Sequence, residues 1–197
     1  MTSILGKQVF TSRLFLSTRP TLFQFRHKST AYSKLPYLHF HPTSNAPLVD
    51  LKYAVSYLSS KDIETPKGEL IIGWTPNNTD IDYTTFMDNT PFVDFLNRVL
   101  KDNIHSINDP VLKSLAEWQK DGWLHIGDER NPPPWGRIPY PEDIIGTVFV
   151  EGGVIQPNTY QPMPTHRLAT SNGIMQLSEP LTQCLIQEAK RVASKQK

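Results

Sequence analysis

The feature that most constrains the fold is a change in hydrophobic period near residue 122. Before this point, apolar residues recur three and four positions apart, the spacing of an amphipathic helix. Two helix starts share one form: Thr90 and Asp109 are suitable N-caps, and a proline that fits the first helical position follows each of them. After Gly122, a natural helix stop, short β-branched and aromatic runs alternate with turn residues. The pattern predicts a helical pair followed by strands.

The strands predicted in the C-terminal half are short and lie beside turn signals. Residues 123–126 and 144–151 are β-like runs, and Gly152-Gly153 can turn the second run back through 154–156 as a hairpin. Asn172-Gly173 separates two further runs, and an Asn-Gly step between strands is a strong hairpin signal. Strands joined by tight turns run antiparallel. We therefore expect a mostly antiparallel sheet.

Two more helices and one more strand complete the predicted set. Residues 50–59 carry apolar side chains at helical spacing, and a last helix is expected after Ser178, whose hydroxyl suits an N-cap. Residues 69–74 form a short β-like run. About four helices and about five short strands, concentrated as hairpins in the C-terminal half, predict an α+β fold. We expect residues 31–197 to form a single domain.

The N-terminal segment has the composition of a mitochondrial presequence. The first acidic residue is Asp50, whereas the preceding stretch carries several lysines and arginines among many serines and threonines. A segment that is basic, hydroxyl-rich and free of acids is typical of a mitochondrial transit peptide. We expect residues 1–30 to be a disordered, cleaved presequence, with the mature chain starting near residues 29–35 in the matrix. The alternative is a basic N-terminal arm that stays attached and binds a partner.

Removal of such a leader changes the charge of the chain. Five of the 20 lysines and arginines lie within residues 1–30, so 15 remain against 19 acids, a formal charge of −4. A negatively charged body repels phosphate backbones, which disfavours nucleic acid as a partner. The longest apolar run outside the leader, 144–150, is far shorter than the roughly 20 residues that span a bilayer. No transmembrane segment is therefore expected.

A proline-rich loop is the first candidate binding site. Residues 128–143 contain five prolines among acidic, basic and aromatic side chains. Prolines stiffen a loop and lower the entropic cost of holding a binding geometry. The alternative is a loop that covers one end of the sheet, with its arginines bonded to nearby carboxylates or carbonyls. The candidate binding residues are Arg130, Trp135, Arg137, Tyr140 and Arg167.

A second candidate site is catalytic. A histidine of the strand at 123–126 and a histidine beyond the second strand could meet across the sheet as an acid–base pair. Carboxylates at the start of the proline-rich loop lie close in sequence to the first of them. The candidate catalytic residues are His125, Asp128, Glu129 and His166.

Other chemistry finds little support in the sequence. His39 and His41 could face one side of a strand as two metal ligands, but no third ligand is evident, so no metal site is predicted. Cys184, the one cysteine, is expected to be a buried small hydrophobe on the last helix. Nucleotide-binding glycine motifs are missing from the sequence, so no cofactor is predicted. Trp118 and Trp123 are expected in the core, and Trp135 at the surface.

Three functions follow from these observations, in order of preference. The first is a non-catalytic mitochondrial matrix protein, an accessory or assembly factor that binds a protein partner through the proline-rich loop. The second is an enzyme for a small polar substrate, using His125 or His166 with Asp128 or Glu129 and an anion-binding Arg130 or Arg137. The third is a mitoribosome-associated protein, favoured only by the basic C-terminal tip. The oligomeric state is not indicated.

Overall fold

The computed structural model describes residues 28–196, which form three α-helices and three antiparallel sheets. The α+β class is thus confirmed. The helices are α1 (Thr90–Asn103), α2 (Pro110–Gln119) and α3 (Glu179–Lys195), with two short 3-10 turns, η1 (Gly68–Leu70) and η2 (Pro141–Asp143). The strands are β1 (Thr30–Ala31), β2 (His39–Pro42), β3 (Tyr53–Ser56), β4 (Gly73–Thr75), β5 (Met87–Asp88), β6 (Gly122–Gly127), β7 (Ile144–Glu151), β8 (Val154–Ile155), β9 (Gln161–Pro162), β10 (Ala169–Thr170) and β11 (Gly173–Ile174).

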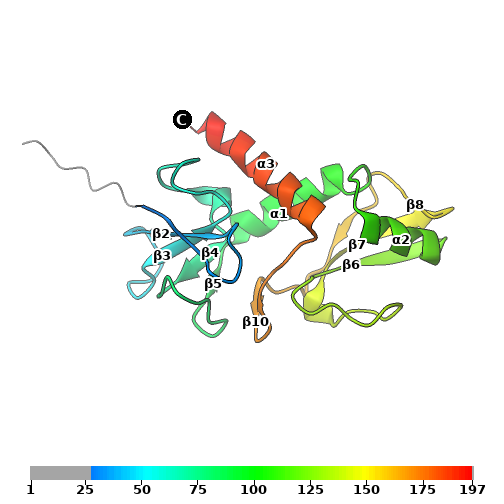
Figure 1. Ribbon diagram of the computed structural model, residues 1–197, viewed down its shortest axis with the longest axis horizontal. Helices are drawn as coiled ribbons and strands as arrows, with labels where there is room; N and C mark the ends of the chain where they lie inside the picture. The colour runs from blue at the N-terminus through cyan, green and yellow to red at the C-terminus, as the bar shows by residue number, and fades with distance from the viewer. Residues whose placement is uncertain (1–27, 197) are drawn as a thin grey trace, which may run out of the picture.

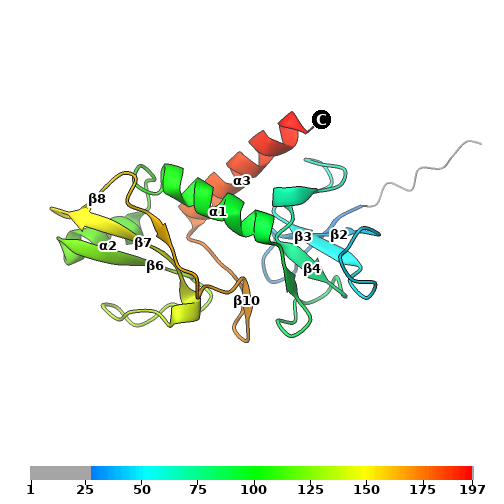
Figure 2. The same cartoon turned by 180° about the vertical axis from the view of Figure 1, so that it is seen from behind.

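The molecule has a sheet at each end and helices between them (Figure 1). Strands β1 to β5 form one sheet in chain order. The other large sheet has the order β6-β7-β8, with β9 paired to β7, and α2 lies against it. The hairpin of β10 and β11 lies between the two sheets, as both views show (Figures 1 and 2).

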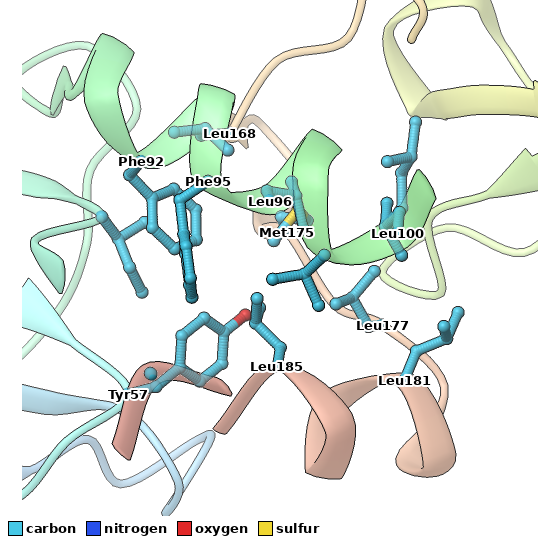
Figure 3. Close-up of a cluster of buried hydrophobic side chains, with 14 of the residues drawn as sticks. Tyr57, Phe92, Phe95, Leu96, Leu100, Leu168, Met175, Leu177, Leu181 and Leu185 are labelled. Atoms are coloured by element: carbon cyan, nitrogen blue, oxygen red, sulfur yellow. The ribbon is translucent and has the colours of Figure 1, made fainter. Parts of the chain in front are cut away.

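One hydrophobic core joins the two ends. Helix α1 runs from the first sheet toward the second, and α3 crosses it (Figure 2). The side chains that meet there are almost wholly buried, and each contributes roughly 1.5–3 kcal/mol relative to exposure. Figure 3 shows that they come from α1, α3, the end of β3 and the segment that carries the β10–β11 hairpin: Phe92, Phe95, Leu96, Leu100, Leu181, Leu185, Tyr57, Leu168, Met175 and Leu177.

A tyrosine attaches the second sheet to α1. The hydroxyl of Tyr160 donates a hydrogen bond to Oδ1 of Asn97 over 2.9 Å, and the ring of Tyr160 lies on the backbone of Gly146 in β7. A Cβ atom at residue 146 would come within 2.5 Å of the ring, so a larger residue there forces the ring away. Glycine therefore interrupts an otherwise β-branched strand because another side chain occupies its place.

The helix starts follow the local sequence closely. Asp109 caps α2 as predicted: its Oδ1 accepts from the N–H groups of Val111 and Leu112. Ser178 caps α3 through the N–H of Leu181. The helix predicted from Thr90 is also present, although its N-cap is Asn89, whose side chain bonds two carbonyls of the preceding segment.

The predicted helix over residues 50–59 was wrong, since Tyr53–Ser56 is β3 in the middle of the first sheet. Residues 54–58 are all buried. A strand covered on both faces shows a continuous apolar run, which periodicity alone does not separate from a buried helix. The predicted concentration of strands in the C-terminal half was also wrong, because strands β1 to β5 form a sheet in the first half of the chain. Of the run predicted at 69–74, only its end is strand β4.

Residues 1–27 of the predicted presequence lie outside the described residues. Its last part is described: the hydroxyl of Ser29 accepts from the N–H of Ser60 over 2.7 Å, and Thr30 pairs with Phe40 in the first sheet. No helix within residues 28–196 is long and apolar enough to cross a membrane.

Candidate functional site

The proline-rich loop connects two neighbouring strands of the second sheet. β6 ends at Gly127 with an irregularity in its register, and β7 begins at Ile144. The two ends of the loop are closed by a backbone hydrogen bond of 2.8 Å from the N–H of Asp128 to the carbonyl of Asp143. The loop is therefore a long excursion from a fixed base.

Arg130 holds that base, and its side chain is fully buried. Its Nε donates to Oδ1 of Asp143 over 2.9 Å and lies 3.5 Å from Oδ2 of Asp128. Its two terminal nitrogens donate to four backbone carbonyls, those of Leu168, Gly173, Glu142 and Arg167. An arginine has five N–H donors, and all five have acceptors here. The guanidinium has no donor left for a ligand, and it joins the loop to the β10–β11 segment.

Asp128 is equally engaged. Its Oδ1 accepts from the N–H groups of Arg130 and Gln176, and its Oδ2 lies 3.3 Å from Nε2 of His166. Together with Asp143, which also accepts from the side chain of Asn131, these groups form a buried cluster of charges. Removal of one partner from such a cluster leaves an uncompensated buried charge and costs several kcal/mol. We call these four residues, Arg130, Asp128, Asp143 and His166, the Arg130 cluster. Their contacts are those of a structural clamp.

The exposed part of the loop forms one wall of a groove. Residues 132–139 face α2 and β6 across a hollow of about 330 Å³. A volume of this order is at the lower limit of the usual range for pockets that bind small molecules. Helix α2, strand β6 and the base of the loop form the other walls. Their lining residues are Val111, Leu115, Trp118 and Gln119 of α2, Trp123, Leu124, His125 and Gly127 of β6, and Asp128 and Glu129 of the loop base.

Three tryptophans border this groove, and all are exposed. Trp118 is 58% exposed, Trp123 46% and Trp135 63%, so the expectation that Trp118 and Trp123 belong to the core was wrong. Helix α2 buries only Leu112 and Ala116. Trp118 therefore lies on the outer face of the helix. The sequence analysis expected Val111, Leu115 and Trp118, at i, i+4 and i+7, to face the core together with Leu112, whereas Val111 and Trp118 are exposed.

The loop packs on the helix through aromatic and glycine contacts. The rings of Trp118 and Trp135 meet edge to face, with centroids 6.5 Å apart. Gly136 has a φ of +73°, a conformation that glycine adopts without strain, and a Cβ at that residue would lie 3.7 Å from the Trp118 ring. Trp123 packs in the same edge-to-face way on Phe149 of β7, at 5.5 Å. The indole rings are thus held in place while much of their surface remains open.

The charges at the groove are few. Glu129 and Arg137 line it, and neither side chain has a hydrogen-bonding or ionic partner within residues 28–196. Partial burial of the Glu129 carboxyl raises its pKa, and the negative charges of Asp109 and Asp128 raise that pKa further. His125 also lines the groove, and its Nδ1 is buried without a hydrogen-bond partner in the described chain.

The predicted catalytic residues are thus divided between two places. His166 contacts Asp128 in the Arg130 cluster. His125, Glu129 and also Asp128 line the groove, and His166 is not part of that lining. The structure brings His166 to Asp128 but places the two histidines in different surroundings. His125 and Glu129 share the groove with the predicted binding residues Trp135 and Arg137.

The remaining predicted binding residues lie elsewhere. Tyr140 is 68% exposed and precedes η2. Arg167 is exposed and lines a second, open hollow of about 630 Å³, together with Tyr83 and residues of the β10–β11 hairpin. The backbone of Arg167 is held on both sides, because its N–H donates to the carbonyl of Glu142 and its carbonyl accepts from Arg130.

The residues considered for metal and thiol chemistry have structural surroundings. His41 is buried, with Nε2 2.7 Å from the carbonyl of Leu58, and burial lowers the pKa of both His39 and His41. Within residues 28–196, no three His, Cys, Asp or Glu side chains are placed to hold one metal ion. Cys184 is half-buried on α3, and burial raises the pKa of its thiol, which disfavours the thiolate.

Comparison with known proteins gives no family for this chain: no family model, curated protein or solved structure matches it.

Proposed function

We propose that this chain is a non-catalytic protein of the mitochondrial matrix that acts as an accessory or assembly factor and binds a protein partner through its tryptophan groove. The tryptophan groove is the hollow between α2, β6 and loop residues 132–139. The observation that supports the proposal is the exposure of Trp118, Trp123 and Trp135 around one apolar hollow. Tryptophan is among the residues most enriched at the energetic centres of protein interfaces.

The rigidity of the groove supports the same proposal. A loop that is ordered before binding loses less entropy when a partner docks, so more of the contact energy appears as affinity. Here the Arg130 cluster fixes the base of the loop, and prolines stiffen its exposed part. The loop therefore holds its apolar side chains at the surface in one conformation and does not fold onto the core.

The proposed compartment depends on the leader. Residues 1–30 carry five basic and no acidic residues, the composition that mitochondrial import selects. Subcellular fractionation with protease protection tests this part, together with N-terminal sequencing of the native chain. A chain that retains Met1 and lies outside the organelle would disprove the mitochondrial assignment and leave the groove proposal standing.

The groove proposal is tested by quantitative affinity purification from isolated mitochondria. The variant Trp118→Ala/Trp135→Ala removes both rings of the edge-to-face pair, and Tyr83→Ala, 53% exposed in the first half of the chain, is the matched control. We expect the double variant to lose at least one partner that wild type and Tyr83→Ala both retain. Identical partner profiles for all three chains would contradict the proposal.

A second candidate function is an enzyme for a small polar substrate, favoured by the presence of His125 and Glu129 in one groove. The imidazole of His125 lines the groove and could exchange a proton with a bound substrate, and Glu129 could supply a second acid–base group. Asp128 and Arg130, by contrast, are engaged in the fold. Metabolite profiling of cells with His125→Gln tests this candidate: an accumulated compound that binds the purified chain would favour it over partner binding.

A further inference from the structure

The tryptophan groove carries one uncompensated charge of each sign, and its geometry places them at opposite ends. Strand β6 begins three residues after the end of α2 and packs along that helix, so Glu129, two residues beyond the end of β6, lies toward Asp109, the N-cap of α2. Arg137 follows Gly136, which packs on the ring of Trp118 near the C-terminal end of the same helix. Nine residues of α-helix separate Asp109 from Trp118, a length of about 14 Å at 1.5 Å per residue.

The other acids near Glu129 are already compensated. Asp128 is bound by Arg130 and faces His166, and Asp109 accepts two N–H groups at the start of α2, where the helix dipole favours a negative charge. Glu129 is therefore the carboxylate at this end that is available to a ligand. The exposed apolar surface of Trp118, Trp135 and Val111 lies along α2 between the two charges.

We infer that the groove accepts an extended segment of the partner protein that carries a Lys or Arg at one end, apolar or aromatic side chains in the middle and an Asp or Glu about four residues away. An extended chain advances about 3.3 Å per residue, so four residues match the length of the groove along α2. This inference rests on the proposed function, and it adds the chemistry and the spacing of the segment that is bound.

The probes that test it are fluorescein-labelled decapeptides with a central Leu-Tyr-Leu and charged residues four positions apart. One peptide carries Lys and Glu at these positions, a second carries two Lys and a third carries two Glu. Anisotropy titrations with the full chain give the dissociation constants. Because the two halves of the mixed peptide complement both ends of the groove, we expect it to bind about three- to fivefold more tightly than either of the others, the usual size of an exposed charge pair.

Charge reversals in the protein then give the decisive comparison. In Glu129→Lys both free charges are positive, so the preference moves to the peptide with two Glu; in Arg137→Glu it moves to the peptide with two Lys. Glu64→Lys, an exposed reversal far along the chain from the groove, is the control and keeps the wild-type order. Trp118→Ala weakens all three peptides by a similar factor.

The outcomes separate this inference from the proposed function. Three outcomes would overturn the inferred segment. The three peptides could bind wild type equally, they could all fail to bind it, or the charge reversals could leave the order of the three affinities unchanged. The groove proposal would survive each of these results if the tryptophan double variant still lost its partner in mitochondria. Peptide binding that Trp118→Ala leaves unaltered would show that the peptides bind outside the groove, which also overturns the inference.

Discussion

The two parts of the proline-rich loop reverse the usual distribution of polar and apolar groups. At its base the most polar side chains, Arg130, Asp128 and Asp143, are buried, and each is satisfied by charged or backbone partners. In its exposed part, the most apolar side chains, Trp135 and Ile138, are more than half exposed. Burial of the charges permits exposure of the tryptophan, because a loop without a fixed base would cover its apolar side chains.

The largest expected effect comes from loss of the clamp. Arg130→Met removes the guanidinium and leaves Asp128 and Asp143 buried with too little positive charge, so we expect unfolding in urea to require about 3–5 kcal/mol less free energy. Arg137→Met, on the exposed part of the same loop, is expected to change stability by no more than about 0.5 kcal/mol. Equal effects of the two substitutions would contradict the division of the loop.

A smaller effect is expected when one acceptor of the clamp loses its charge. Asp143→Asn keeps an oxygen near Nε of Arg130 but replaces a charge-assisted hydrogen bond with a neutral one. We expect a loss of about 1.5–3 kcal/mol in the free energy of unfolding, the range for hydrogen bonds to charged groups. Chemical denaturation measures it. A double variant with Arg130→Met should lose less than the sum of the single losses, since both changes act on one contact.

The tryptophans are expected to matter little for stability. Trp118→Ala breaks the edge-to-face contact with Trp135, and such contacts contribute about 0.5–1.5 kcal/mol. Phe95→Ala, at a fully buried ring of α1, should cost about 3–5 kcal/mol and serves as the comparison. Thermal unfolding of the two variants tests this. A loss in Trp118→Ala as large as in Phe95→Ala would mean that the groove is part of the core.

The smallest expected effect concerns pH and Glu129. The folded chain raises the pKa of this carboxyl, so ionisation is less favourable in the folded than in the unfolded state. Stability associated with Glu129 is therefore fully present at pH values below its unfolded pKa and falls as the pH rises through the raised value. Glu129→Gln should equal wild type in acid and exceed it at neutral pH, by no more than about 0.5 kcal/mol. Unfolding midpoints at both pH values give the sign, and a variant less stable at neutral pH would contradict it.

The sequence predicted those parts of the fold that local signals determine. The starts of α2 and α3 follow from Asp109-Pro110 and Ser178, whose side chains act within three residues of themselves. Strand β3 was mistaken for a helix because its burial on both faces depends on β2, β4 and the core, none of which appears in its own spacing.

The sequence indicated the loop residues that line the groove, but neither the α2 side of the groove nor the clamp at its base. Trp135 and Arg137 line the groove as the composition of the loop indicated. The clamp could not be foreseen, because Arg130 binds four backbone carbonyls and every residue, proline included, carries one, so no sequence pattern marks their convergence. The exposure of Trp118 depends on how α2 rests on the second sheet, which is a tertiary property.

The first edge of the five-stranded sheet sets a limit on proteolytic trimming. Ser29 and Thr30 bond to Ser60 and pair with β2, and the buried ring of Tyr32 packs edge to face on Phe40 while its hydroxyl donates to Asp80. A protease that cut before Ser29 would leave all of these contacts in place. A cut after Lys34 would remove the edge strand and uncover Phe40, so the polypeptide that folds best begins at or before Ser29.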